Sequence, residues 1–93
     1  MVLHLSGDVV LPLNELVAIL DIRALDEPDT AAFVKRIPEE RTVRALPGEG
    51  LKSVVVASGA GGCRVFFSPI SSLTLARRAA FMHTFEQKER DDS

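Results

Sequence analysis

The stretch Phe66–Ala79, FFSPISSLTLARRA, joins the end of a strand to the start of a cationic helix. Phenylalanine favours strands, and Pro69 has no N–H to donate to a neighbouring strand, so we expect strand pairing to stop there. Ser71 or Ser72 is expected to cap the helix, because a serine oxygen accepts a hydrogen bond from the backbone N–H groups of the first turn. A strand followed at once by a helix indicates that the chain uses both kinds of element.

Short apolar runs, separated by turn residues, predict further strands. They are expected at Val2–Ser6, Val9–Pro12, Leu16–Ile22, Thr42–Leu46, Ser53–Ala57 and Cys63–Phe67. Turns are expected at Gly7–Asp8, Pro47–Gly50 and Gly59–Gly62, and the last two would join three consecutive strands as hairpins. Leu16–Ile22 is apolar without alternation, so we expect it inside the sheet with both faces buried. The fold class predicted is α+β, with a small mixed or antiparallel sheet of five to six strands.

Two helices are expected beside this sheet. The first is Pro28–Arg36, which has a proline in its first turn and cations at its end. The second runs roughly from Ser72 to Gln87. The side chains expected to face inward are Ala32, Phe33 and Ile37 around the first helix, and Leu73, Ala76, Ala80 and either Phe81 or Phe85 on the second. A second apolar flank, Leu75, Ala79 and Met82, predicts that the last helix packs partly against another subunit.

Length and composition indicate one small globular domain. The chain has 93 residues, 46% of them hydrophobic. We expect a single domain over residues 1–85 and an acidic, flexible tail over residues 86–93. No apolar run reaches the roughly 20 residues of a membrane-spanning helix, and the N-terminus lacks signal-peptide features, so a cytoplasmic location is expected. The single cysteine, Cys63, is expected to be a small core residue.

The charges are unevenly distributed along the chain. Residues 1–30 hold six acidic residues and one basic residue, whereas residues 31–85 hold eight basic and three acidic residues, hence a net charge of +5. This central segment is a candidate for binding a polyanion. The alternative is that its bases are scattered solubilising charges.

Patterns typical of catalysis and metal binding are missing from the sequence. Gly48–Ser53 has the residue types of a phosphate loop, but it leads into a strand rather than a helix. His4, Cys63 and His83 do not have the spacing of metal ligands. No nucleophile can be matched with a base and an orienting group. We therefore expect no enzyme activity, no cofactor, no metal and no small-molecule substrate.

Four blocks, in this order along the chain, carry a resemblance to a known family. They are Leu3–Val10, Leu16–Asp21, Leu51–Val56 and Ser68–Leu75, and together they extend over residues 2 to about 82. The chain resembles the extracellular matrix regulator family, RemA and RemB, and looks most like the RemB branch. The resemblance implies a small α+β subunit that assembles into a ring-like homo-oligomer. It also implies a bacterial transcriptional regulator of extracellular matrix (biofilm) genes that binds double-stranded DNA with low specificity.

The resemblance also directs attention to particular positions. RemA-type members carry an arginine just before the apolar strand and another before the valine-rich strand. In this chain the first position holds Glu15, and the second falls at or near Gly50, which leaves Lys52 as the nearest base. A glutamate there would repel phosphate. Two hypotheses follow: a DNA-binding regulator, or an oligomeric protein-interaction scaffold that has lost DNA binding.

Six basic residues are the candidate site residues. We expect Arg41, Arg44, Lys52 and Arg64 to contact DNA phosphates, with Arg44 pointing outward from an alternating strand. Arg77 and Arg78 on the last helix have two alternative roles. They contact phosphate, or they form ion pairs with acids of the next subunit such as Asp21 or Glu15.

Overall fold

The strands form two sheets rather than the single sheet that the sequence predicts. The computed structural model describes residues 1–6, 9–44 and 50–91, with side chains up to Phe81. Within these ranges, β1 (Val2–Ser6) and β2 (Val9–Pro12) pair antiparallel, and a second sheet has the order β3–β5–β6–β4. The strands of the second sheet are β3 (Leu16–Asp21), β4 (Thr42–Arg44), β5 (Ser53–Gly59) and β6 (Gly62–Ser68). The α+β class, the β1–β2 hairpin and the β5–β6 hairpin are confirmed.

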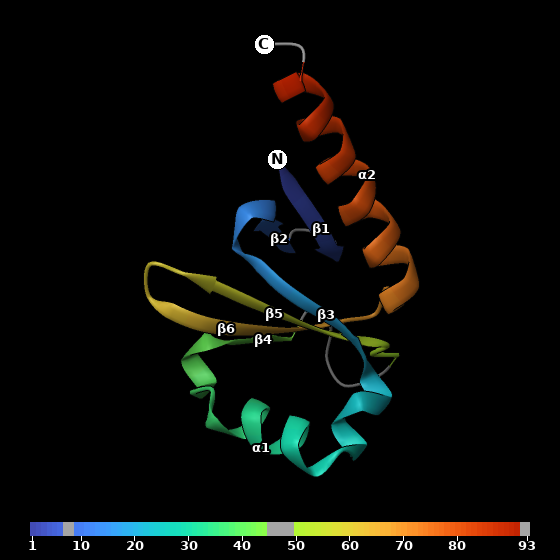
Figure 1. Ribbon diagram of the computed structural model, residues 1–93. Coiled ribbons are helices and arrows are strands. Elements are labelled where there is room, and N and C mark those ends of the chain that lie inside the picture. Colours follow the sequence, from blue (N-terminus) through green and yellow to red (C-terminus); the bar gives the residue numbers. More distant parts are fainter. Residues whose placement is uncertain (7–8, 45–49, 92–93) are drawn as a thin grey trace.

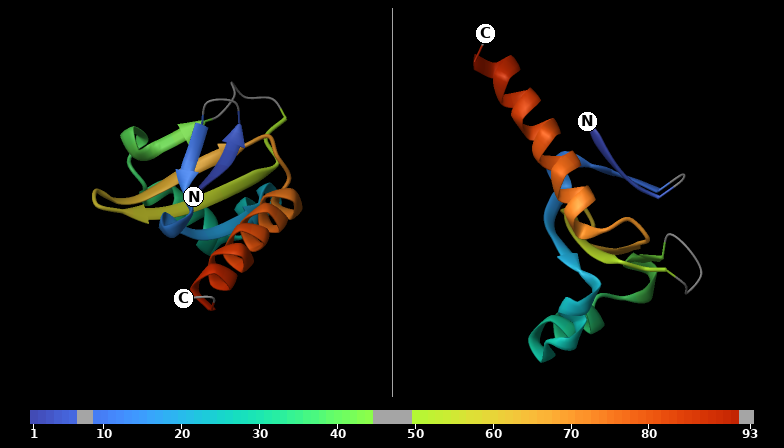
Figure 2. Two further views of the ribbon diagram at one scale, coloured as in Figure 1. Left: turned by 90° about the horizontal axis from the view of Figure 1, so that it is seen from above. Right: turned by 90° about the vertical axis from the view of Figure 1, so that its right-hand side faces the viewer.

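The four-stranded sheet is the middle layer of the fold (Figure 1). The β1–β2 hairpin and the helix α2 (Ser72–Asp91) lie over one face, and the helix α1 (Pro28–Arg36) lies over the other. Three short 3-10 helices connect the strands in the described ranges: η1 (Leu13–Glu15), η2 (Ile22–Asp26) and η3 (Glu39–Arg41). Figure 2 shows from the side that α1 and α2 extend from opposite faces.

Each face of the middle sheet has its own hydrophobic core. On the α2 face, Leu3, Leu5 and Leu11 of the hairpin and Leu75 of α2 are fully buried together with residues of β5 and β6. On the α1 face, Val54, Val65 and Phe67 pack against partly buried residues that include Val34 and Ile37. The hairpin forms a separate sheet because its leucines cover the face of the larger sheet instead of extending its edge. In the described residues, no helix combines the length and the apolar character that crossing a membrane requires.

The prediction that Leu16–Ile22 lies inside the sheet is wrong. β3 is an edge strand that pairs only with β5 in the described structure, and most of its residues are half-buried. Its register shifts between Leu16 and Ala18, and Val17, within this irregularity, is 61% exposed. The residues of this run are apolar because other elements cover parts of both faces of β3. A strand covered on both faces can still be at the edge of its sheet, with a neighbouring strand along only one edge.

The predicted hairpin between the fourth and fifth strands is also wrong. β4 pairs with β6 in parallel, with Arg44 opposite Phe67, so β6 separates β4 from β5. Eight residues connect Arg44 to Ser53. A connection of this length does not oblige the two strands to pair, unlike a two-residue hairpin loop. The turn predicted at Gly7–Asp8, the end of the strand at Ala45–Leu46 and most of the turn before Gly50 lie outside the described residues.

Helix α1 has the predicted bounds but a different inward stripe. Val34 and Ile37 pack against the core, whereas Ala32 is exposed and Phe33 is 40% exposed. Ile37 was assigned correctly, and Phe33 is on the sheet side but only partly covered. The helix is only nine residues long, and Val34 and Ile37 at its C-terminal end pack into the core, while Phe33 lines a cavity between α1 and the sheet.

Helix α2 begins where the sequence predicts and extends four residues further, to Asp91. Ser71 caps it, since the Thr74 N–H donates to Ser71 Oγ at 3.2 Å. The predicted faces are reversed, however. Leu75 and Ala79 pack against the core, while Leu73, Ala76, Ala80 and Phe81 are exposed. The side chains of Met82 and Phe85 lie outside the described part.

Two buried serines set the direction in which the chain enters α2. Ser53 and Ser68 lie opposite each other at the ends of β5 and β6, and both are fully buried. Ser53 Oγ donates to the carbonyl of Ile70 at 2.8 Å, and Ser68 Oγ accepts from the Ile70 N–H at 3.1 Å. Ser68 also donates to the carbonyl of Leu5 in the hairpin. Because the N–H and the carbonyl of Ile70 are both hydrogen-bonded to these serines, the start of α2 is oriented so that Leu75 faces the core.

Candidate nucleic-acid interface

Arg41 and Arg64 meet at the end of the β5–β6 hairpin. Arg41 belongs to η3, and its guanidinium donates to the carbonyls of Cys63 at 2.9 Å and Gly62 at 3.2 Å. Arg64 belongs to β6, and its guanidinium carbon lies 5.3 Å from the centre of the Phe66 ring. Both arginines line a cavity of about 330 Å³, the hairpin-end cleft, whose lining residues are Glu15, Arg41, Gly59, Ala60, Gly61 and Arg64. The structure therefore brings together two of the four predicted phosphate contacts.

Glu15 lies in the same cleft, and sequence reasoning did not foresee its partner. Its carboxylate accepts a hydrogen bond from Arg64 Nη2 and forms an ion pair with it. The register explains the meeting, because Leu16 pairs with Ala57 and Ala57 pairs with Arg64, which places the start of β3 two strands away from Arg64. Glu15 and Arg64 are 49 residues apart in the chain, and no local sequence pattern predicts a contact between residues so far apart.

Two glycines of the hairpin leave room for these side chains. A Cβ atom at Gly59 would lie 2.8 Å from a carboxylate oxygen of Glu15, and one at Gly61 would lie 2.6 Å from Arg41 Nη1. Gly62, which starts β6, has a φ of +103°, a conformation that strongly favours glycine. The Gly59–Gly62 turn, predicted as a flexible connection, is thus also one wall of the cleft.

Arg44 and Lys52 lie toward the other end of the sheet, away from the hairpin-end cleft. Arg44 is exposed, as the alternation predicts, and its guanidinium carbon lies 4.7 Å from the centre of the Phe67 ring. Lys52 is exposed just before β5. The Lys52 backbone is fixed, since its N–H donates to Ser68 at 2.8 Å and its carbonyl accepts from Ile22 at 3.0 Å. The four predicted contacts therefore form two separate pairs.

Arg77 and Arg78 are exposed on α2. The described residues provide neither of them with an ion pair. The acids considered as their partners in a neighbouring subunit are already engaged within the chain. Glu15 binds Arg64, and Asp21 binds Arg23 with a separation of 3.0 Å between Arg23 Nε and Asp21 Oδ1. The hydrogen bonds from Arg23 hold the pKa of the Asp21 carboxyl below its usual value.

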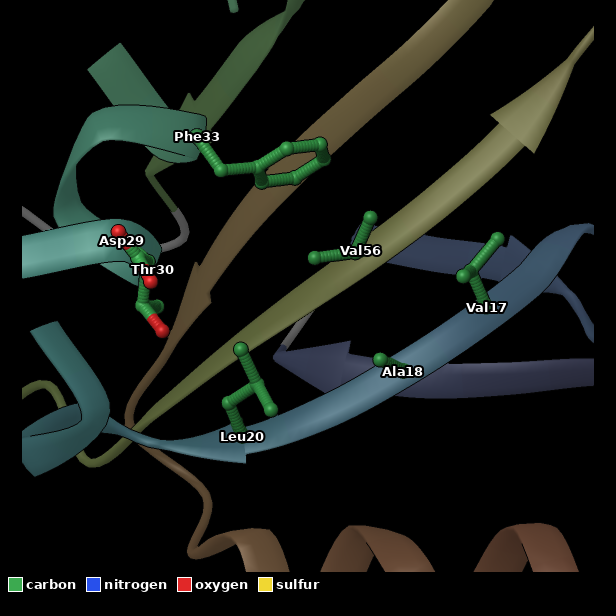
Figure 3. Close-up of a pocket in the computed structure, with 7 residues that line it drawn as sticks. All are labelled: Val17, Ala18, Leu20, Asp29, Thr30, Phe33 and Val56. Carbon is green, nitrogen blue, oxygen red and sulfur yellow. The ribbon is translucent and has the colours of Figure 1, made fainter. Parts of the chain in front are cut away.

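Two exposed apolar surfaces accompany the basic residues. The α2 stripe consists of Leu73, Ala76, Ala80 and Phe81, with Leu73 60% and Phe81 74% exposed. The β3–α1 groove is an apolar cavity of about 320 Å³, lined by Val17, Ala18, Leu20, Asp29, Thr30, Phe33 and Val56 (Figure 3). The stripe belongs to the helix on one face of the middle sheet, and the groove lies on the opposite face, beside α1.

The other polar candidates whose side chains the structure describes do not form a chemical centre, and the side chain of His83 lies outside the described part. Among the described residues, no three histidine, cysteine, aspartate or glutamate side chains gather as metal ligands would. Cys63 is exposed beside the hairpin turn, so its predicted place in the core is wrong. It is the second residue of β6, in the part of the strand that is not covered by the hairpin or the helices, so its side chain is not buried.

Comparison with known proteins identifies a relative along most of the chain. This chain is 34% identical over 82 residues to that relative, extracellular matrix regulatory protein B of Bacillus subtilis (strain 168). The alignment covers 88% of this chain and 94% of the relative. No protein-family model and no solved structure matches. Because the identity extends over nearly the whole length of both chains, the resemblance predicted from the four sequence blocks is confirmed. The chain belongs to the RemA/RemB family of extracellular matrix regulators.

Proposed function

We propose that this protein is a DNA-binding transcriptional regulator of extracellular matrix genes, which acts in the bacterial cytoplasm as a homo-oligomer. Its relative is named as a regulatory protein of the extracellular matrix. The observation that carries DNA binding is the exposure, at one end of the sheet, of Arg44, which is paired with Phe67 of β6, and of Lys52, whose backbone groups are hydrogen-bonded. Exposed cations held in place are what a phosphate backbone recognises, with little dependence on base sequence.

Packing supports the role of these two residues. Arg44 lies over the Phe67 ring, and a guanidinium that stacks on an aromatic ring keeps its N–H groups available at the edges. Lys52 projects from a backbone that both neighbouring segments hold by hydrogen bonds. Little conformational freedom of the backbone is therefore lost when either residue contacts a phosphate.

Self-association is supported by the two exposed apolar surfaces. A protruding stripe on one face and an apolar groove on the opposite face suit a head-to-tail contact, in which the α2 stripe of one copy enters the β3–α1 groove of the next. Such contacts close into a ring when the rotation between copies allows it. Repetition of one modest basic patch around an oligomer raises its affinity for DNA, because each further phosphate contact becomes intramolecular.

The test is a titration of fluorescent duplex DNA, followed by anisotropy at low and high salt, with the oligomeric mass measured first by light scattering. We expect binding at micromolar concentrations or tighter at low salt, weakening steeply as salt rises because each neutralised phosphate releases counterions. The double variant Arg44→Glu/Lys52→Glu is expected to lose most of this binding and to keep the oligomer.

A matched control is Lys35→Glu/Arg36→Glu. It changes the net charge by the same amount at exposed positions at the end of α1, in a different element from the proposed contacts. We expect it to weaken DNA binding far less. Equal losses in the two double variants would show that only net charge matters and would remove Arg44 and Lys52 from the interface.

The Glu15–Arg64 ion pair favours a second candidate function, that of an oligomeric interaction scaffold without DNA affinity. A carboxylate in the hairpin-end cleft repels phosphate and occupies a potential phosphate contact. An oligomer of wild-type protein that ignores DNA even at low salt would favour this scaffold.

A further inference from the structure

The hairpin-end cleft has the components of an oxyanion site, with a carboxylate already inside it. Two guanidinium groups and three residues of a glycine-rich turn line the cavity, and Glu15 contributes the negative charge. Arg64 has five N–H donors, of which the structure uses one on Glu15. Arg41 uses donors on two backbone carbonyls, which fixes its guanidinium at the rim. Donors thus remain available for an anion that enters from solvent.

The balance of charge decides whether an anion enters. With Glu15 ionised, the cleft holds two positive charges and one negative charge, and the negative one is bonded to Arg64. A phosphate that approaches Arg64 must displace this carboxylate or share the guanidinium with it. The side chains of Arg64 and Glu15 are 31% and 29% exposed, so water and external anions reach the pair. Partial burial keeps the attraction stronger than that of a fully solvated pair.

We propose that Glu15 is an internal competitor for phosphate, and that breaking its ion pair with Arg64 sets the affinity of this protein for DNA. The proposal rests on the proposed DNA-binding function and adds the hairpin-end cleft as a second, masked phosphate contact. Arg64 already lies over the Phe66 ring and points into the cleft, so removing the carboxylate charge leaves its donors in place for a DNA phosphate. Carboxylate and phosphate oxygens accept from a guanidinium in the same geometry.

The experiment compares wild-type protein with Glu15→Gln in the DNA titration described above. Glutamine has nearly the same shape, and its side-chain oxygen still accepts from Arg64, so the fold is preserved while the competing charge is lost. We expect DNA affinity at low salt to rise at least about threefold. The slope of log affinity against log salt should steepen by about 0.9 for each subunit that gains a phosphate contact. Circular dichroism and light scattering on the same samples verify fold and oligomeric state.

Two further variants make the result specific. Glu27→Gln removes the same charge at an exposed position next to α1 and is expected to leave affinity nearly unchanged. Glu15→Gln/Arg64→Gln is expected to cancel the gain of Glu15→Gln, because the guanidinium that would bind the phosphate is gone. An equal gain from Glu27→Gln, or a gain that survives the loss of Arg64, would overturn the proposal.

The outcomes separate this proposal from the proposed function. If the wild type binds DNA and Glu15→Gln binds no better, the competition is refuted while the DNA-binding function stands. If only Glu15→Gln binds, the competition is supported and the wild type acts as the scaffold. If neither protein binds at low salt, both proposals fall.

Discussion

Ser68 is a fully buried residue whose hydroxyl joins three parts of the fold. It donates to Leu5 in the hairpin and accepts from the Ile70 N–H before α2. Ser68→Ala would remove this partner from the buried carbonyl of Leu5 and from the partly buried N–H of Ile70. We expect the free energy of unfolding to fall by about 1–3 kcal/mol, measured by urea denaturation.

The control for Ser68→Ala is Ser58→Ala, an exposed position on β5 for which the structure gives no side-chain hydrogen bond. We expect a change within about 0.5 kcal/mol there. Equal effects of the two substitutions would mean that the loss of a hydroxyl from a strand, and not the buried hydrogen bonds, determines the stability.

At the residue scale, the sequence predicts only those side-chain positions and hydrogen bonds that depend on residues nearby in the chain. Alternation in a short strand correctly places Arg44 outward, and the serine before the last helix correctly caps it. The Glu15–Arg64 ion pair depends on the pairing of β3 with β5, which no local pattern specifies. The basic residues of the candidate site were therefore predicted. Their separation into Arg41 and Arg64 at one end of the sheet and Arg44 and Lys52 at the other was not predicted.

The orientation of α2 is the main lesson at the scale of elements. The helix has apolar residues on two sides, and a spacing of three and four residues fits both. The chosen side follows from how Ser53 and Ser68 hold the entry to the helix, which is tertiary information. Helix and strand positions were thus mostly predictable, whereas the inward faces were not.

Substitutions on the two sides of α2 test this orientation. Leu75 is fully buried, so Leu75→Ala is expected to lower the free energy of unfolding by about 2–5 kcal/mol. Leu73 is exposed, so Leu73→Ala is expected to change it by less than about 1 kcal/mol. Urea denaturation in a Phe81→Glu background keeps self-association from contributing. A larger loss for Leu73→Ala would contradict the orientation.

At the scale of the whole molecule, the layer arrangement was harder to predict than its parts. All six strand positions were recognised at least in part, yet the pairing of β4 with β6 and the separate β1–β2 sheet were not. Pairing over long sequence distances depends on which faces the hairpin and the helices cover. A hydrophobic pattern shows which face of a strand is buried, but it does not show which strand or helix buries it.

The placement of the apolar surfaces makes a prediction about assembly. Phe81→Glu disables the α2 stripe, and Val17→Glu disables the β3–α1 groove. Because the proposed contact is head-to-tail, we expect each variant alone to be monomeric. An equal mixture should form a one-to-one dimer, since one intact stripe and one intact groove remain. Light scattering after size-exclusion chromatography measures the masses.

Val10→Glu provides the control for this experiment, because Val10 is another exposed apolar residue but lies on the β1–β2 hairpin. It should assemble like the wild type. If Val17→Glu still oligomerises by itself, or if the mixture stays monomeric, the contact between stripe and groove is refuted.

The irregularity in β3 also bears on the risk of aggregation through the edges of the sheet. An open edge strand offers free backbone groups to any other extended chain, and uncontrolled pairing of that kind leads to fibres. In the described structure the shift between Leu16 and Ala18 interrupts one edge of the middle sheet, and the other edge, β4, is only three residues long. In the proposed assembly, copies associate through side chains, while the interrupted edge and the short edge limit the backbone pairing that leads to fibres.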